Sequence, residues 1–369
     1  MRTETLEAEI SVVQEPQLDF LYYPKTNLTT TKEQKKETLN VLSLFSGCGG
    51  MDLGFEGGFS VLQQSINEIL TPHFIDKKEK NGFVKLKKTK FKTVFANDIL
   101  TDARNAWVNY FSKKGHNAED FYKESIVDLV KMYRSGVNVF PEEIDVVTGG
   151  FPCQDFSVAG KRNGFTSHKN HKGELINNNT ASTETRGQLY MWMKEVIDIT
   201  QPKIFIAENV KGLVNLGDVK SIIQNDFSSA NGNGYIVLDP QVLHSANFGV
   251  PQSRERVIFI GIKKSALKKS ALAELEKQTI SEQYNPYPNP THSYTAEGEN
   301  LKHFVQLKDL FKNLDEPENA EDLSQKFYSK AKFMGVSLRV GLSVPSPRSF
   351  LAVGFPLLSL TQLKPNQLN

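Results

Sequence analysis

Cysteine is scarce in this chain, with Cys48 and Cys153 the two among 369 residues. Two thiols cannot build a disulfide scaffold or, by themselves, a four-cysteine zinc site. No apolar run approaches the roughly 20 residues of a membrane span. The N-terminal segment MRTETLEAEI carries acids where a secretory signal would have its apolar stretch. We therefore expect a cytoplasmic protein, in a reducing compartment and without membrane partners.

An excess of charge of one sign is also lacking, because 44 Lys and Arg balance 42 Asp and Glu to a net of +2. Any surface that binds a polyanion must therefore be local. The motif GxxxxGK[ST] is absent, which argues against a P-loop protein. The hydrophobic residues, 39% of the chain, suffice for the core of one large domain or two medium ones.

Short apolar runs alternate with helix-like segments between residues 40 and 262. Strands are predicted at 40–45, 92–98, 144–151, 203–210, 235–243 and 256–262. Helices are predicted at 101–111, with Thr101 as N-cap, and at 186–200, and a helix-like stretch follows residue 50. This alternation predicts an α/β fold with a doubly wound, mostly parallel sheet, in which ligands bind beyond the carboxyl ends of the strands.

Composition divides the chain into four parts. Residues 1–39 are a polar leader, 40–262 the part with alternating strands and helices, 263–335 a segment with aromatic and basic residues and 336–369 an atypical tail. A lysine-rich insertion at about 69–92 interrupts the second part. It has two interpretations: a solvated hairpin or loop, or an arm that contacts phosphates.

Polar residues that could bind a ligand or react with one follow the predicted strands. The glycine turn FSGCGG (45–50) suits close approach of a ligand, although it is also compatible with a plain tight turn. Asp98 ends the next strand, where a carboxylate can accept hydrogen bonds from the hydroxyls of a ribose. Cys153, in GGFPCQ, has the setting of a nucleophile, whereas Cys48 fits a small packing residue.

Two further motifs carry charge at strand ends. Glu208, in AENV, ends an apolar strand, where a carboxylate is costly unless it is paired or used. Gln252, Arg254 and Arg256 alternate in QSRER and so share a face. Two guanidiniums on one face can clamp a phosphate, a carboxylate or a polarised ring oxygen, and a salt-bridged surface strand is the alternative.

Taken in order, FSGCGG, FAND, GGFPCQ, TRGQLY, AENV and FGVPQSRERV resemble the motif series of the DNA cytosine-C5 methyltransferases. The resemblance covers residues 41–262. It implies that 40–262 is an S-adenosylmethionine-binding catalytic domain and that 263–335 is a partial target-recognition region. It also implies a Rossmann-like sheet that binds S-adenosylmethionine and a double-stranded DNA substrate. Cys153 then resembles the nucleophile that attacks C6 of a flipped-out cytosine. Glu208 resembles the residue that holds N3 and the amino group, and Arg254 and Arg256 resemble the pair near O2, with Arg254 the closer to the base.

The resemblance also implies a set of cofactor-binding residues, which are Phe45, Ser46, Gly47, Gly49, Gly50, Asn97, Asp98, Ser125, Ile126, Pro152 and Leu189. Ser125 departs from the family, which usually has Asp at this position. A zinc deaminase is set aside for want of a His/Cys/Cys cluster, and a nicotinamide-dependent oxidoreductase does not account for PCQ, AENV and QSRER.

The C-terminal third departs from the pattern. Residues 336–369 contain no Asp or Glu, and the return motif and late helix of the family are not found. Two functions are therefore expected: the modification enzyme of a restriction-modification system, with a cognate endonuclease encoded nearby, or a truncated or split-chain member, inactive alone, that needs a complementing C-terminal chain. The DNA sequence recognised and the oligomeric state are not predicted.

Overall fold

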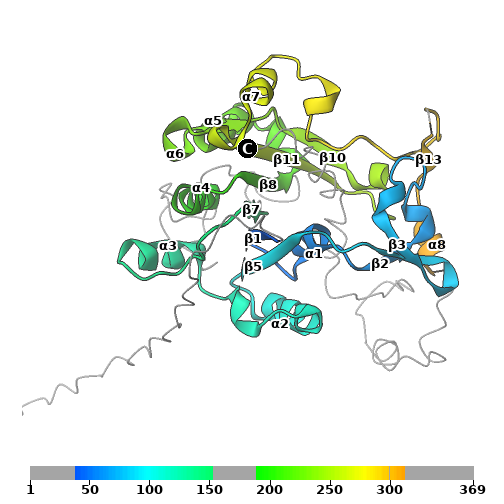
Figure 1. Ribbon diagram of the computed structural model, residues 1–369, viewed down its shortest axis with the longest axis horizontal. Coiled ribbons are helices and arrows are strands. Elements are labelled where there is room, and N and C mark those ends of the chain that lie inside the picture. The colour runs from blue at the N-terminus through cyan, green and yellow to red at the C-terminus, as the bar shows by residue number, and fades with distance from the viewer. Residues whose placement is uncertain (1–37, 153–187, 299, 312–369) are drawn as a thin grey trace, which may run out of the picture. The chain divides into compact units, whose positions relative to one another are not determined.

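The computed structural model describes residues 38–152, 188–298 and 300–311, all within a unit that starts at Glu37. Several predicted parts lie outside the described residues: 1–37 of the leader, Cys153, the first two residues of the helix at 186–200, 312–335 of the recognition region and the tail. A central sheet dominates the described part (Figure 1). Its strand order is β10-β11-β8-β7-β1-β5-β6, with β9 paired to β11.

Five of these strands are parallel, as the sequence predicts. They are β1 (Leu39–Leu44), β5 (Phe91–Asn97), β6 (Phe121–Tyr122), β7 (Val146–Gly149) and β8 (Ile204–Val210). The other three are antiparallel: β9 (Tyr235–Val237), β10 (Gln241–His244) and β11 (Glu255–Lys263). The prediction of one strand at 235–243 is wrong, because the chain breaks at Asp239 and Pro240, and proline has no N–H for a ladder.

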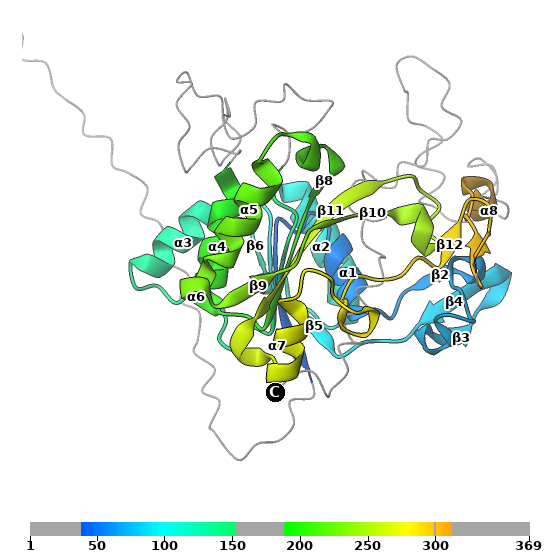
Figure 2. The ribbon, with the colours of Figure 1, turned by 90° about the horizontal axis from the view of Figure 1, so that it is seen from above.

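Helices cover both faces of the sheet (Figure 2). Leu42 and Leu44 of β1 pack in one core with α3 (Ile126–Arg134), α4 (Leu189–Thr200) and α5 (Val219–Ser228). Val41 points to the opposite face, where α7 (Lys269–Leu275) and Phe55 of α1 (Gly50–Glu56) pack. Since side chains alternate along a strand, a run of apolar residues supplies both cores. The remaining helices are α2 (Thr101–Phe111), α6 (Ala230–Asn233) and α8 (Leu307–Phe311).

The start of α2 differs from the prediction. Its N-cap is Leu100, which makes no side-chain cap bond, and Thr101 is the first helical residue. Asp98 forms a turn just before the helix, because its Oδ1 accepts the N–H of Leu100, two residues on, at 2.9 Å. The N-cap is therefore Leu100, one residue before the predicted N-cap, Thr101. Among the described helices, none is both long and apolar enough to cross a bilayer.

The lysine-rich insertion contains an antiparallel hairpin of β3 (Ile75–Lys78) and β4 (Phe83–Leu86), in keeping with the hairpin interpretation. It starts earlier than the predicted 69, because β2 (Ser60–Leu62) pairs with β4 to complete a separate three-stranded sheet of order β2-β4-β3. Val84 and Leu86 are buried, so this part of the chain is not a plain loop. Exposed lysines line its outer side, and Lys77 stands directly opposite Lys85.

The insertion is fastened to the segment that follows β11. Asn67, 1% exposed, donates through Nδ2 to the carbonyls of Thr291 (2.9 Å) and Asn300 (2.7 Å). The segment itself contains two short paired strands, β12 (His292–Ser293) and β13 (Lys302–His303). The fully buried His292 lies 3.0 Å from the Gln64 carbonyl through Nε2. Residues 291–300 of the predicted recognition region are thereby held against the insertion.

Candidate active site at the carboxyl ends of the strands

The strand order reverses between β1 and β7. From β1 the chain moves outward to β5 and β6, and then returns to place β7 and β8 on the other side. Such a switch point opens a crevice at the carboxyl ends of the two central strands. Phe45–Gly50 follow β1 there, and Gly150–Pro152 follow β7.

The turn after β1 has a backbone that favours glycine. Gly47 (φ 56°) and Gly49 (φ 85°) are left-handed, and Phe45 adopts φ 53° without being glycine. A Cβ on Gly49 would lie 2.4 Å from Phe111 and 2.6 Å from Trp107, so the glycine is also required by packing. Ser46 fixes the turn further, because its Oγ accepts the Asn97 N–H at 3.1 Å. Cys48 is buried, as expected.

The end of β5 is tied to this turn. Asp98 accepts the Gly47 N–H through Oδ2 at 3.0 Å, so the acid and the turn form one unit. Asn97, 1% exposed, donates through Nδ2 to the carbonyls of Tyr122 (3.0 Å) and Glu124 (2.8 Å). The half-buried Asp98 carboxylate thus lies beside the crevice with its orientation fixed by main-chain donors.

Other residues expected at the cofactor site are less exposed. Ser125 is the N-cap of α3, and its Oγ accepts the Val127 N–H at 3.3 Å. Ile126 and Leu189 are 2% and 3% exposed and belong to the core beneath the strands. Gly50 opens α1, and Pro152 is the half-buried last described residue after β7.

The residues expected to be catalytic converge on one carboxylate. Glu208 Oε1 lies 2.6 Å from Arg256 Nε and 3.4 Å from Arg254 Nη2. The three side chains are 16–18% exposed, so these ion pairs are partly shielded from water. Glu208 stands opposite Ile258 in the β8–β11 ladder, which makes Arg256 its diagonal neighbour on one face.

Gln252 does not extend this strand face, because β11 begins at Glu255 and Gln252 belongs to the preceding turn. The buried hydroxyl of Ser245 fixes the conformation of that turn. It donates to the Gln252 carbonyl (2.5 Å) and accepts the Arg254 N–H (3.1 Å). The position of Arg254 beside Glu208 therefore depends on a serine from the end of β10.

The end of β7 approaches the same carboxylate from the other side. A Cβ on Gly150 would lie 3.1 Å from Glu208 Oε2, so the chain passes close to the acid at this point. Asn209, 1% exposed, donates through Nδ2 to the Phe151 carbonyl at 3.3 Å. The segment leading to Cys153 is thus bonded to β8, while Cys153 itself lies outside the described residues.

The sequence analysis missed a buried polar layer beneath the glycine turn. Asp52 accepts the Trp107 Nε1–H at 2.7 Å, and burial raises the pKa of its carboxyl to about 6. Nearby, His116 lies 3.0 Å from Glu56 and 3.7 Å from Asp120. Burial alone would lower the pKa of His116, but the two carboxylates outweigh it and raise that pKa to about 9. Polar residues at one-turn spacing in α1 (Asp52 and Glu56) are the signal that could have revealed this layer.

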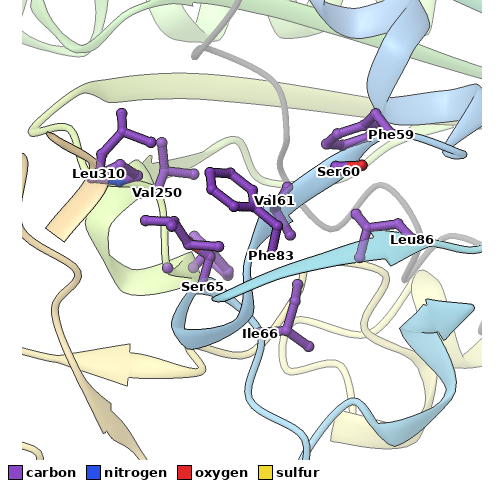
Figure 3. Close-up of a pocket in the computed structure, with 13 residues that line it drawn as sticks. Phe59, Ser60, Val61, Ser65, Ile66, Phe83, Leu86, Val250 and Leu310 are labelled. Atoms are coloured by element: carbon purple, nitrogen blue, oxygen red, sulfur yellow. The ribbon is translucent and has the colours of Figure 1, made fainter. Parts of the chain in front are cut away.

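An apolar cavity of about 180 Å³ lies between the insertion and the Phe248–Pro251 turn (Figure 3). Neither Glu208 nor the arginines beside it line this cavity. Val61, Phe83 and Leu310 are among the side chains that line it. It contains no charged lining residue, and we assign the chemistry to the strand ends rather than to this cavity. Its lining is the packing surface between the insertion and the catalytic domain.

The architecture is that of an α/β protein with a doubly wound sheet and a ligand crevice at its switch point. Residues 80–342 match the family described as C-5 cytosine-specific DNA methylase. The chain belongs to that family of DNA methyltransferases.

Two curated relatives found by sequence agree with this assignment. The chain is 35% identical to Type II methyltransferase M.BsuRI of Bacillus subtilis over 286 residues, which cover 76% of this chain and 52% of that protein. It is 32% identical to M.BspRI of Lysinibacillus sphaericus over 285 residues, covering 76% and 54%. The chain therefore spans about half the length of these curated relatives. A mutant of Spodoptera frugiperda DNMT2 is 17% identical with a TM-score of 0.38, covering 72% of this chain and 61% of that one.

Proposed function

We propose that this chain methylates C5 of cytosine in double-stranded DNA, with Cys153 as the nucleophile and S-adenosylmethionine as the methyl donor. Its family membership supports the reaction class. The observation that carries the proposal is the shared carboxylate of Glu208, held by Arg254 and Arg256 and approached by the β7 end at Gly150. A nucleophile on the chain that leaves β7 would act beside that acid.

The crevice fits the cofactor in its donor set. A fixed carboxylate, Asp98, lies next to a glycine turn whose backbone leaves room for a ligand, as a nucleoside with two ribose hydroxyls requires. The residues that would hold the cofactor are Phe45, Ser46, Gly47, Gly49, Gly50, Asn97, Asp98, Ser125, Ile126, Pro152 and Leu189. When bound, S-adenosylmethionine supplies an electrophilic methyl group.

Glu208, Arg254 and Arg256 form the acid–arginine cluster. Each of its side chains has a role that follows from its chemistry. The Cys153 thiolate adds to C6 of the cytosine ring, which makes C5 nucleophilic. Glu208 gives a proton to N3 as the thiolate adds and accepts a hydrogen bond from the amino group, and the guanidiniums of Arg254 and Arg256 face the charge that develops on O2; Glu208 takes the N3 proton back when sulfur leaves. After C5 is methylated, the C5 proton leaves to a base, the ring double bond re-forms and the bond from C6 to sulfur breaks. Cys153 is then restored.

The cellular setting is part of the same proposal. Relatives named Type II methyltransferases suggest the modification half of a restriction-modification system, with a cognate endonuclease encoded nearby. A reduced cysteine nucleophile suits the cytoplasm. A complementing C-terminal chain is the alternative partner, and it would be detected as activity that appears when that chain is added.

The test is methyl transfer from labelled S-adenosylmethionine to unmodified genomic DNA. A covalent adduct with DNA that contains 5-fluorocytosine is the second readout. Cys153→Ser should abolish both, whereas Cys48→Ser should retain the adduct, because these are the two cysteines of the chain. An adduct that persists in Cys153→Ser would remove this residue as the nucleophile.

Glu208→Gln tests the acid separately. The substitution keeps the size of the side chain and removes its charge, so methyl transfer should fall by about 10²–10⁴-fold, as for other groups that act on protons in the transition state. Cofactor affinity should stay within about twofold of wild type, since Glu208 contacts Arg254 and Arg256 rather than the glycine turn. Retained activity would contradict the role assigned to Glu208.

A further inference from the structure

Tyr294 presents a large aromatic ring to solvent on a fixed backbone. It follows β12 directly and is 82% exposed. The Phe304 N–H donates to the Ser293 carbonyl at 3.1 Å, and His303 Nδ1 lies 3.2 Å from the Tyr294 carbonyl oxygen, close enough to donate. The main chain on either side is therefore ordered, while the ring extends away from it. An exposed ring on an ordered backbone loses little conformational freedom on binding.

A line of rings connects Tyr294 to the acid–arginine cluster. The Tyr294 ring packs edge-on against Phe304 at 6.4 Å between centroids, and Phe304 packs against His244 at 5.9 Å. His244 Nε2 lies 3.1 Å from Ser253 Oγ, and Ser253 immediately precedes Arg254. The two centroid separations place the Tyr294 ring no more than about 12 Å from the His244 ring.

We propose that Tyr294 stacks on a DNA base that becomes unstacked when the target cytosine is extruded. This inference rests on the proposed function, because it needs DNA bound at the acid–arginine cluster. Base flipping leaves neighbouring bases without a stacking partner, and an aromatic side chain can replace that partner.

The electrostatics of the loop favour stacking over phosphate contact as the source of affinity. The exposed Glu297 lies three residues after Tyr294, and its charge repels phosphate. Lys302, the nearest lysine in β13, directs its Nζ to the Ile66 carbonyl at 2.8 Å. Removal of the Tyr294 ring should therefore weaken DNA binding without changing the dependence of affinity on salt.

The experiment measures binding of the full chain to a fluorescently labelled pool of 40-base-pair duplexes of random sequence, and KM for unmodified genomic DNA. Tyr294→Ala should weaken both by about tenfold, equivalent to about 1.4 kcal/mol. Tyr294→Phe should restore them, because it keeps the ring. Tyr133→Ala is the matched control: this tyrosine on α3 is also exposed and packs against a phenylalanine, Phe140, but belongs to no contact with the cluster.

The outcomes separate the two proposals. DNA affinity of Tyr294→Ala within twofold of wild type overturns the stacking role and leaves the proposed function intact. An equal loss in Tyr133→Ala also overturns it, since the effect would then not be specific to the cluster. A drop in melting temperature of Tyr294→Ala with unchanged DNA binding would assign the ring to packing within the protein. A wild-type chain that binds no DNA overturns the proposed function, and the stacking role with it.

Discussion

Gly249 is the position where one added methyl group should do the most damage to the contact between insertion and catalytic domain. It adopts φ 77°, and a Cβ there would lie 2.2 Å from the Ser65 carbonyl oxygen and 2.7 Å from His292 Cε1. Ordinary contacts begin at 3.4 Å, so the first gap must widen by about 1.2 Å. The opposing atoms are a main-chain oxygen and a buried ring, neither of which can swing aside.

Gly82 provides a matched control, because it has the same φ of 77° and nothing within 4 Å of its added Cβ. Gly82→Ala should cost about 1–2 kcal/mol for the left-handed backbone, less about 0.4–1 kcal/mol from the restricted unfolded chain. Gly249→Ala should cost the same plus about 1–3 kcal/mol for overpacking. The difference between the two variants is therefore about 2 kcal/mol.

Thermal unfolding followed by circular dichroism measures this difference. At about 2 °C per kcal/mol for a chain of this size, Gly249→Ala should melt roughly 4 °C below Gly82→Ala. Equal melting temperatures would refute the reasoning, because they would mean that the two segments separate at no cost. Methyl transfer should fall in Gly249→Ala as well, since the Phe248–Pro251 turn leads directly to the arginines.

Two further predictions concern charge. The pKa of His116 is raised to about 9 from 6.5, so its contribution to stability is complete below about pH 6.5 and is lost as the pH rises through 9. This difference is worth on the order of 3 kcal/mol, and denaturant unfolding at pH 6.5 and 9.5 should show the loss in wild type but not in His116→Gln; parallel losses in both would contradict it. In the insertion, replacing Lys77, Lys78 and Lys80 by Gln should reduce the slope of log affinity for DNA against log salt by at least about 1. An unchanged slope would leave these lysines as a solvated face.

The sequence predicts the sheet well because its strands are short buried runs with polar residues at their ends. The grouping of Glu208, Arg254 and Arg256 does not follow from a parallel sheet, because the arginines stand at the start of β11 and meet the end of β8 only because these two strands are antiparallel. The three-stranded sheet of the insertion could not be predicted, because its lysines conceal the alternating Val84 and Leu86 that pack inward. A composition dominated by charge is typical of a solvated loop.

Contacts between distant segments were equally hidden from sequence reasoning. The hydrogen bonds from Asn67 to Thr291 and Asn300 join residues more than 200 positions apart, and neither segment contains a sequence pattern that predicts the contact. The prediction of Thr101 as the N-cap of α2 failed for a local reason. Asp98 Oδ1 accepts the Leu100 N–H just before the helix, while its other oxygen accepts the Gly47 N–H in the glycine turn. One acid with two structural duties is not visible in a capping pattern.

The entry and exit of the insertion are paired with each other. Gly57 and Lys88 form an antiparallel bridge, and the Gly58 N–H donates to the Lys87 carbonyl at 3.1 Å. The chain therefore leaves α1 and returns to β5 through a narrow neck, whose geometry does not depend on what lies between. Because the entropy of closing a loop grows only with the logarithm of its length, segments of very different size can be accommodated at this neck. It is a natural place to graft a foreign domain onto the catalytic sheet.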